Sequence, residues 1–423
     1  MGSRVSRTRS ARLIASSRDR RGDDPIFALN AEAMRRARAG EDVLNSTLGT
    51  LMDEEGRLAL LPSVCEAFRR IGPERTAGYA PIAGPPAFLE AVVRDVLGSS
   101  PLATSAVAVA TPGGSGALYL AATSFLEPGQ SVLTSSYFWS PYQTIAAQAG
   151  RALETYEMFA ADGGLDVLAL EQALERDRVR QGRTLLFLNT PCHNPTGYSL
   201  DERDWRALVP VLARAAERTP LTVLMDVAYA RYAPGDPSHW VSWLEPLCGA
   251  ATVLVAWSAS KSFAQYGARI GACLALESEA EERERTCQAL GHACRGTWSN
   301  CNHLGMLAVT ECLTDPALAT RVERERGALR ELLAARARCF VELARGEHLS
   351  FPRYEGGFFV TVSTPDPERT AAAMRQRGVY VVPIPGAVRV ALCSTPLAAV
   401  PRLVEALVAG VRAAGGPGTP AGS

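Results

Sequence analysis

Short apolar runs alternate with longer helical stretches from about residue 105 onward. The β-rich runs that we interpret as strands are 106–110, 131–134, 184–188, 221–225, 252–256 and 270–275. Between them, apolar positions recur at helical spacing. Continuous apolar strands that alternate with helices are typical of a mainly parallel sheet covered by helices on both faces. The pattern therefore predicts an α/β domain.

Further elements flank this region on both sides. Helical periodicity is found at 28–39, 86–97, 314–345 and 397–413. Additional strands are expected near 358–363, 379–382 and 388–392. The long charged helix at 314–345 would lead out of the first domain. The remaining elements predict a smaller α/β domain that is built from both ends of the chain.

These patterns divide the chain into five segments. Residues 1–23 form a basic extension and residues 415–423 a Gly/Pro-rich tail, and we expect both to be disordered. The large domain spans 62–325. The small domain combines 24–61 with 326–414.

The first 22 residues contain seven arginines and a single acid, Asp19. Such a composition is found in organelle transit peptides. It also fits a bacterial extension, which the arginine bias of the whole chain favours.

Composition and charge exclude several classes of protein. The net charge is zero, so there is no overall attraction to nucleic acid or to a membrane surface. No apolar run reaches the roughly 18–20 residues that span a bilayer. The ten cysteines show no CxxC pair and no cysteine–histidine spacing suited to zinc. We therefore expect reduced thiols, no metal site and a cytoplasmic location.

Polar residues follow several of the predicted strands, at the edge where open α/β sheets bind ligands. The turn Gly113-Gly114-Ser115 opens a helix, which favours phosphate, although glycine-rich turns are common. Asp226 ends another strand and has Tyr229 three residues on. This pair suits a protonated ring nitrogen and its neighbouring hydroxyl, or else an ordinary helix cap with a packing tyrosine.

Lys261 is the one lysine among the 44 basic residues of the chain. Arginine can replace lysine wherever a positive charge suffices, but it stays protonated and does not bond to a carbonyl carbon as a free amine does. The lysine follows the strand 252–256 and lies between Ser258 and Arg269, which are suited to bind phosphate. A lysine retained by chance is the alternative. Its neighbours favour a covalent pyridoxal phosphate (PLP) site.

Taken together, these motifs and the run Asn189–Gly197 resemble the fold type I PLP-dependent enzymes. The resemblance is greatest to the aspartate/aromatic aminotransferase-like branch of the class I aminotransferases, and it covers about residues 24–412. It implies PLP as the cofactor and Lys261 as the residue that holds it covalently and moves the substrate α-proton. Asp226 would pair with the pyridinium nitrogen. Asn194 and Tyr229 would hydrogen-bond the 3-hydroxyl oxygen.

The resemblance also implies roles around the ring and the phosphate. Trp139 matches the aromatic residue that stacks on the ring beside the substrate, although a core tryptophan is the ordinary alternative. The residues that would bind the phosphate are Gly113, Gly114, Ser115, Ser258 and Arg269. Tyr79 matches a tyrosine that reaches the phosphate from a neighbouring subunit, which implies a homodimer with active sites at its interface.

Substrate recognition would rest on two arginines. Arg389 resembles the arginine that binds the substrate α-carboxylate through a bidentate pair, and Asn194 would touch the same carboxylate. Gly49 matches a loop that covers the substrate. Arg295 matches an arginine that binds the distal carboxylate of aspartate or glutamate from the neighbouring subunit, unless it is an ordinary surface arginine.

Two departures from the family pattern lie close to this site. The family usually has histidine at two positions near the pyridine-binding aspartate, and here these positions hold Tyr142 and Asn189. Both side chains can form hydrogen bonds, so the network around Asp226 is expected to differ in kind. The run 300–303 also lacks the paired prolines that the family usually has there.

The leading hypothesis is a PLP-dependent aminotransferase. It would move an amino group from an L-amino acid, aspartate or a related dicarboxylic or aromatic one, to a 2-oxo acid such as 2-oxoglutarate. The alternative is a PLP enzyme of specialised metabolism that carries out β- or γ-elimination, replacement or carbon–carbon bond formation. A non-catalytic regulator would need a DNA-binding segment, and residues 1–22 are too short to form one.

Overall fold

The computed structural model describes residues 13–18 and 25–416 of the 423-residue chain. Residues 1–12, 19–24 and 417–423 lie outside the described residues. They make up most of the basic extension and of the tail, so the expected disorder of these two segments stays a prediction. Ahead of residue 25 the structure describes one short helix, α1 (Ala15–Arg18).

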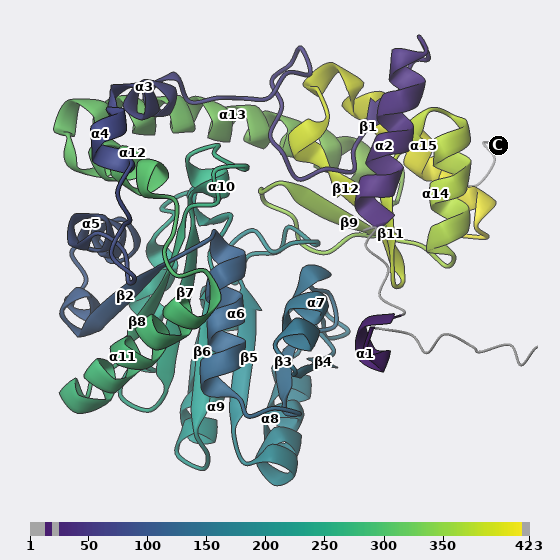
Figure 1. The fold of residues 1–423 in the computed structure, drawn as a ribbon. Coiled ribbons are helices and arrows are strands. Elements are labelled where there is room, and N and C mark those ends of the chain that lie inside the picture. The colour runs from purple at the N-terminus through teal and green to yellow at the C-terminus, as the bar shows by residue number, and fades with distance from the viewer. Residues whose placement is uncertain (1–12, 19–24, 417–423) are drawn as a thin grey trace, which may run out of the picture.

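A mixed sheet of seven strands forms the centre of the larger group of elements (Figure 1). In spatial order the strands are β2 (Ala106–Thr111), β8 (Gly271–Leu276), β7 (Thr252–Ser258), β6 (Leu221–Asp226), β5 (Thr184–Asn189), β3 (Ser131–Ser135) and β4 (Ala152–Tyr156). Only β8 runs antiparallel to its neighbours, β2 and β7. The other neighbouring pairs are parallel, so the prediction of a mainly parallel sheet is confirmed.

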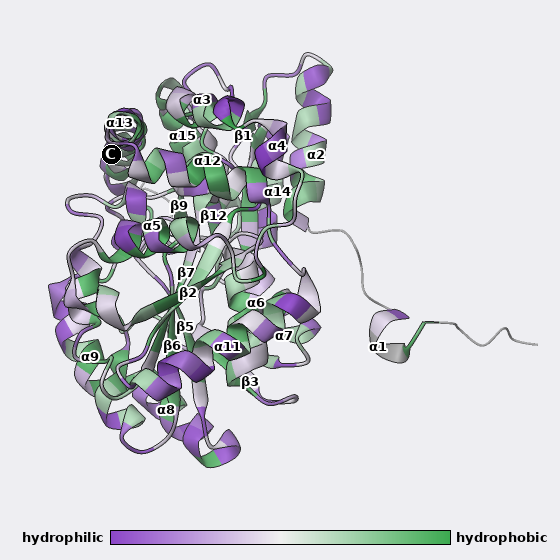
Figure 2. Ribbon diagram, turned by 60° about the vertical axis from the view of Figure 1, so that its left-hand side comes forward, coloured by the Kyte–Doolittle hydropathy of each residue, from purple (hydrophilic) through white to green (hydrophobic). Residues whose placement is uncertain are grey.

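Helices cover both faces of this sheet. One core cluster includes residues of α6 (Gly114–Phe125), α7 (Pro141–Gln148) and α11 (Ala280–Thr297). The other includes residues of α3 (Pro62–Arg70), α5 (Pro86–Leu97), α8 (Val167–Gln181), α9 (Glu202–Ala216) and α12 (His303–Thr314). In β5, Leu185 and Phe187 belong to the first cluster and Leu186 to the second. Because both faces of the inner strands are buried, strands such as β7 and β8 are apolar along most of their length. Figure 2 colours each residue of the ribbon by its hydropathy.

A second, smaller group of elements combines segments from both sides of the sheet region. Its three-stranded antiparallel sheet has the order β11 (Val382–Ile384), β12 (Ala387–Ala391) and β9 (Phe359–Ser363). The helices that belong to it are α2 (Pro25–Arg38), α14 (Pro367–Gln376) and α15 (Val400–Ala413). Near the start of the chain, β1 (Leu44–Asn45) pairs with β10 (Val379–Tyr380), so the small α/β domain is built from both ends.

One long helix, α13 (Pro316–Gly346), connects the two groups, and in Figure 1 it runs from α12 toward α15. The remaining short helices are α4 (Pro73–Thr76), α10 (Ala259–Ser262), η1 (Pro101–Ser105), η2 (Ala230–Tyr232), η3 (His239–Trp243), η4 (Leu392–Ser394) and η5 (Leu397–Ala399). No helix in residues 13–18 or 25–416 is long and apolar enough to cross a membrane. The domain limits at 61/62 and 325/326 stay predictions.

The sequence pattern missed two strands, the two-residue β1 and the edge strand β4, and displaced several boundaries. Strand β4 was not expected, because it lies at the sheet edge and most of its residues are at least partly exposed, which leaves no continuous apolar run. The run 379–382 is divided between β10 and β11. The first long helix begins at Pro25, three residues earlier than the periodicity indicates, because proline is well suited to the first helical turn.

Candidate active site

A cavity of about 500 Å³ opens at the carboxyl ends of the parallel strands β5, β6 and β7. The register of the sheet places the last residues of these strands side by side, with Asn189 opposite Asp226 and Asp226 opposite Ala256. The predicted site residues that line the cavity are Gly49, Gly114, Ser115, Trp139, Asn194, Asp226, Tyr229, Ser258, Lys261, Arg269 and Arg389. Side chains from distant parts of the sequence therefore converge on one volume.

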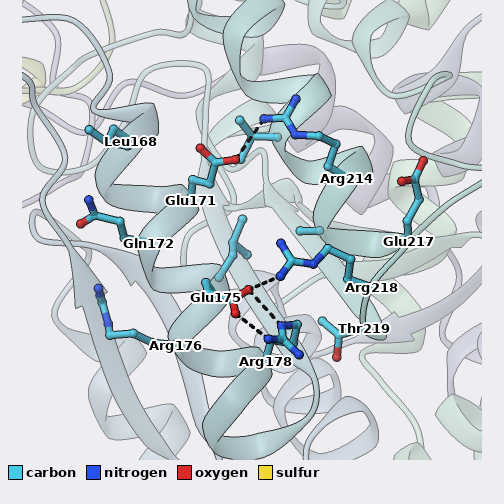
Figure 3. A pocket seen from close by; sticks show the side chains of 13 residues that line it. Leu168, Glu171, Gln172, Glu175, Arg176, Arg178, Arg214, Glu217, Arg218 and Thr219 are labelled. Atoms are coloured by element: carbon cyan, nitrogen blue, oxygen red, sulfur yellow. Dashed lines mark hydrogen bonds and ion pairs between the residues drawn. The ribbon is translucent and has the colours of Figure 1, made fainter.

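A larger surface groove, of about 630 Å³, lies between α8 and α9. Figure 3 shows that its charged side chains point toward one another: Arg214 pairs with Glu171, and both Arg178 and Arg218 pair with Glu175. None of the predicted cofactor residues lines this groove. We therefore assign the candidate active site to the smaller cavity.

Lys261 lies on α10, one turn after the end of β7, where the Ser258 side chain caps the helix. Its Nζ donates a hydrogen bond to the carbonyl oxygen of Gly49. The same atom lies 4.5 Å from the centre of the Tyr266 ring. Burial lowers the pKa of Lys261 to about 8, and the nearby charges of Arg269 and Arg389 act in the same direction. A neutral amine is therefore accessible near physiological pH.

Asp226 ends β6 as a buried carboxylate. Its Oδ2 accepts a hydrogen bond from the Tyr142 hydroxyl at 2.7 Å, and its Oδ1 accepts one from the Ala228 amide at 3.1 Å. Burial raises the pKa of Asp226, whereas these two hydrogen bonds lower it. The Tyr142 hydroxyl remains a donor, because burial and the adjacent Asp226 raise the pKa of Tyr142 well above its usual value.

The two residues that stand in place of histidine both contact Asp226. Tyr142 binds its carboxylate, and the Asn189 side-chain amide donates to its backbone carbonyl at 2.8 Å. Asn189 also accepts a hydrogen bond from the Asn194 backbone amide at 2.6 Å. The network around Asp226 is thus built from neutral hydrogen-bonding groups.

Asn194 and Tyr229 lie next to each other on the same wall of the cavity. The Asn194 side-chain amide donates to the Tyr229 hydroxyl at 3.3 Å. The Asn194 Oδ1 atom is buried and has no hydrogen-bond partner among the described residues. A buried acceptor without a partner is costly, so this atom is suited to a donor from a bound molecule.

The glycine-rich turn and Arg269 form a cradle at the start of α6. Gly113 has a φ of +73°, and a Cβ added to it would lie 2.5 Å from Arg269 Nη2. Arg269 also donates to the Ser260 hydroxyl at 3.2 Å and to the Pro112 carbonyl oxygen at 3.3 Å. Glycine at 113 therefore leaves room for the guanidinium beside the first amides of a helix, an arrangement that suits phosphate.

Arg389 lies on β12, on the side of the cavity formed by the small domain. It is buried, it donates to the Thr47 carbonyl oxygen at 2.7 Å, and its guanidinium lies 4.5 Å from the centre of the Phe359 ring. Arg389, Gly49 and Lys261 line the same cavity. The positive charge of Arg389 is close enough to lower the pKa of Lys261.

Three predicted residues do not line this cavity: Gly113, which lies against Arg269, and Tyr79 and Arg295, which the single chain does not bring to it. Tyr79 is 93% exposed, and Arg295 is exposed on α11, where it donates to the Ser299 hydroxyl.

The run 300–303, which lacks the paired prolines, is held by hydrogen bonds of Asn302. Asn302 caps α12 through the Gly305 amide at 3.0 Å and donates to the Ala268 carbonyl oxygen at 2.8 Å, next to Arg269.

Sequence reasoning missed several cavity residues. Tyr266 contacts the Lys261 amine, and its hydroxyl accepts a hydrogen bond from the Leu51 amide at 2.9 Å. An apolar wall that was not foreseen consists of Ile26, Phe27, Leu48, Leu118, Pro141 and Phe359. Tyr266, five residues after the lysine and close to Arg269, offered a signal. The wall did not, because its residues come from separate segments and resemble ordinary core positions.

The cavity residues fit PLP. The Lys261 amine, the Asp226 carboxylate, the open acceptor of Asn194 and the cradle with Arg269 match an aldehyde, a ring nitrogen, a ring hydroxyl and a phosphate. When bound, PLP supplies an electron sink that makes the substrate α-proton removable. Lys261 would then hold and move that proton. The fold and site define a fold type I PLP-dependent enzyme.

Comparisons with known proteins identify the family. The profile of the family "Aminotransferase class I and II" matches residues 41–407, and the chain belongs to this family. Its enzymes use PLP, which is therefore the cofactor, and the protein is a PLP-dependent aminotransferase. It is 31% identical over 371 residues to the aromatic-amino-acid aminotransferase of Pseudomonas aeruginosa, covering 85% of this chain and 90% of that one.

Two further similarities agree with this assignment. The aspartate aminotransferase of Pseudomonas aeruginosa is 29% identical over 372 residues, again covering 85% of this chain and 90% of that one. The crystal structure of an aminotransferase from Anaerococcus prevotii superposes with a TM-score of 0.89 at 30% identity, covering 94% of this chain and 98% of that one. Amino transfer is thus favoured over elimination, replacement or bond formation.

The lowered pKa of Lys261 gives a prediction for cofactor attachment. Covalent attachment requires the unprotonated amine, so its rate in the cofactor-free protein should rise with pH through about 8 and then level off. Stopped-flow absorbance after mixing with PLP measures this rate. In urea-unfolded protein the rise should continue toward about pH 10.4, the value of an unperturbed lysine. A folded-state midpoint near 10.5 would contradict the proposed environment of Lys261.

The contact between Tyr142 and Asp226 gives a second prediction. In Tyr142→Phe the buried carboxylate loses a donor and its pKa rises further, so a larger fraction becomes neutral and cannot pair with a pyridinium nitrogen. PLP affinity should fall about tenfold or more, since a hydrogen bond to a charged group contributes about 1.5–3 kcal/mol. Tyr156→Phe, at a similarly buried tyrosine, is the control. Equal dissociation constants for the two variants, measured by absorbance titration, would refute this role.

Proposed function

We propose that this aminotransferase takes its amino group from L-aspartate or a related dicarboxylic or aromatic L-amino acid and gives it to a 2-oxo acid such as 2-oxoglutarate. One observation carries the proposal: the buried guanidinium of Arg389 shares a cavity with the amine of Lys261. An α-amino acid held by its carboxylate at Arg389 would present its α-carbon to the cofactor beside the lysine. The names of the two Pseudomonas aeruginosa relatives support this range of substrates.

The proposed roles follow the positions of the side chains. Lys261 would bind the cofactor and transfer the α-proton, with Asp226 holding the ring nitrogen and Tyr229 and Asn194 at the ring hydroxyl. Trp139 would stack on the ring and border the substrate. Gly113, Gly114, Ser115, Ser258 and Arg269 would bind the phosphate. Asn194 and Gly49 would complete the site around the α-carboxylate.

We also propose that the active enzyme is a homodimer. Tyr79 and Arg295 are exposed and lie outside the cavity of their own chain. In a two-fold dimer, these residues of one protomer would enter the cavity of the other, Tyr79 at the phosphate and Arg295 at the distal carboxylate of the substrate. The domain division at 24–61, 62–325 and 326–414 belongs to the same proposal, with each cavity lying between the two domains.

The apolar wall of the cavity supports acceptance of aromatic substrates. Phe27, Leu118 and Pro141 line the same volume as Trp139, so a ring could be buried there without an unpaired charge.

We place the enzyme in the cytoplasm and in amino-acid metabolism with a biosynthetic role. Its ten cysteines are free thiols, which fits a reducing compartment.

Arg295 provides the sharpest test of substrate choice. Arg295→Gln should raise KM for L-aspartate by about ten- to hundredfold, the equivalent of losing a charge-assisted hydrogen bond, and should leave KM for L-phenylalanine within about twofold. Arg285→Gln, which removes an exposed arginine of the same helix that pairs with Glu281 and Glu282, is the control. Steady-state assays with 2-oxoglutarate as acceptor measure both constants.

The two substrates must be tested separately for the result to be decisive. Equal effects of Arg295→Gln on L-aspartate and L-phenylalanine would refute the role of Arg295 in recognising a distal carboxylate. Steady turnover of either amino acid in the absence of any 2-oxo acid would instead support elimination or another reaction of the alternative class.

A further inference from the structure

Two arginines of the connecting helix α13 are buried, although arginine is rarely found inside a protein without partners. Arg326 is 4% exposed and Arg336 is fully buried. They lie ten residues apart, which corresponds to about 15 Å along a helix. Each donates hydrogen bonds to a different segment that adjoins residues of the cavity.

Arg326 contacts the segment that carries the lysine. Its Nε donates to the carbonyl oxygen of Ser262 at 2.9 Å, at the end of α10. The carbonyl oxygen of Lys261 itself accepts a hydrogen bond from the Tyr232 hydroxyl at 3.1 Å. At Arg326, ten residues after its start, α13 is thus attached to the element that positions Lys261.

Arg336 contacts the segments that adjoin Arg389. Its Nη1 donates to the Cys393 carbonyl oxygen at 2.9 Å, and its Nη2 donates to the Met52 carbonyl oxygen at 3.0 Å. Its Nε and Nη2 also donate to Glu54 Oε1, at 3.0 and 2.6 Å. The other oxygen of Glu54 accepts from the Leu397 amide at 2.7 Å. The pair therefore connects α13, residues 52–54 and residues 392–397.

Residues 52–54 and 392–397 adjoin Gly49 and Arg389, the two residues proposed to lie around the substrate α-carboxylate. We call residues 46–54 and 389–397 together the carboxylate arm. Within it, the Ala391 amide donates to the Ser46 carbonyl oxygen at 3.0 Å, and the Met52 amide donates to the Cys393 carbonyl oxygen at 2.9 Å. Gly49 lies between these two contacts, and Arg389 lies on β12 two residues before Ala391. A displacement of the arm would move both residues relative to Lys261.

We propose that Arg336 and Glu54 form a clamp that holds the carboxylate arm to α13 and so positions Arg389 and Gly49 relative to Lys261. Both are positioning residues: Arg336 acts through backbone carbonyls, Glu54 acts through Arg336 and the Leu397 amide, and neither touches the substrate. The proposal depends on the function proposed above, in which Arg389 binds the α-carboxylate. The physical reason is that a buried guanidinium needs its full set of acceptors, so one arrangement of the arm satisfies it better than any other.

Glu54→Gln is the test variant. Glu54 is 38% exposed, so the change is mild, keeps one acceptor oxygen and removes the charge that faces Arg336. Glu55→Gln is the matched control, since the adjacent Glu55 is 64% exposed and pairs with the exposed Arg57. Arg336→Lys is a second, stronger variant that retains the charge but not the planar fork.

Hydrogen–deuterium exchange and steady-state kinetics would be measured on the PLP-loaded enzyme. In Glu54→Gln, amides of residues 46–53 and 391–394 should exchange faster, whereas Glu55→Gln should match the wild type. KM should rise about tenfold for both L-aspartate and 2-oxoglutarate, because both carry an α-carboxylate and a small misplacement of its binding group is costly. The dissociation constant of PLP should stay within about twofold of the wild-type value, since the cofactor contacts lie elsewhere.

The outcomes separate this inference from the proposed function. Unchanged exchange, or KM values equal to those of Glu55→Gln, would overturn the clamp. A variant Arg389→Lys provides the second comparison. If Arg389→Lys raises KM and Glu54→Gln does not, the clamp alone is wrong. If Arg389→Lys leaves KM unchanged, the proposed role of Arg389 is wrong, and the function of the clamp falls with it.

Discussion

The burial of one primary amine is the constraint on which this active site depends. Lys261 lies at the carboxyl edge of the central sheet, under the rings of Tyr229, Tyr266 and Phe358. Removal from water disfavours the ammonium form, and the nearby guanidinium groups disfavour it further. The same low-dielectric surroundings strengthen every other charge interaction in the cavity. In the proposed function, cofactor attachment, proton transfer and carboxylate binding would all take place within reach of that amine.

The buried carboxylate of Asp226, which lines the same cavity, has the reverse requirement. In its proposed role Asp226 would have to stay ionised in a buried position to pair with a protonated ring nitrogen, and burial raises its pKa and so acts against this. Tyr142 and Asn189 meet this need with a phenol and an amide, whereas imidazoles usually occupy these positions in the family. Neither group changes its charge near neutral pH. The departures from the family pattern therefore preserve the hydrogen bonds to Asp226 while removing two titratable groups.

Much of this arrangement can be predicted from the sequence, and the reasons are local. The strands buried on both faces are continuous apolar runs, and the residues at their ends, such as Asp226 and Asn189, are brought together by parallel register. The helix Pro86–Leu97 was predicted at its observed limits, because its periodicity is regular and proline precedes it.

Other features could not be predicted from local patterns. The edge strand β4 was missed because half-exposed strands lack an apolar run. Phe27 and Arg336 were missed because their positions depend on contacts between segments far apart in the sequence, whereas Tyr266 lies close to Lys261 in the sequence and could have been found. Tyr79 and Arg295 lie outside the cavity of their own chain, so their proposed roles require a second protomer whose cavity they enter.

The central claim is that the cofactor is held covalently by the buried amine of Lys261. Reduction of the PLP-loaded protein with sodium borohydride fixes the cofactor to the nitrogen that holds it, and proteolysis with mass spectrometry locates that nitrogen. The account predicts one modified peptide, with the reduced cofactor on Lys261. Attachment to any other amine, or full release of the cofactor after reduction, would contradict it.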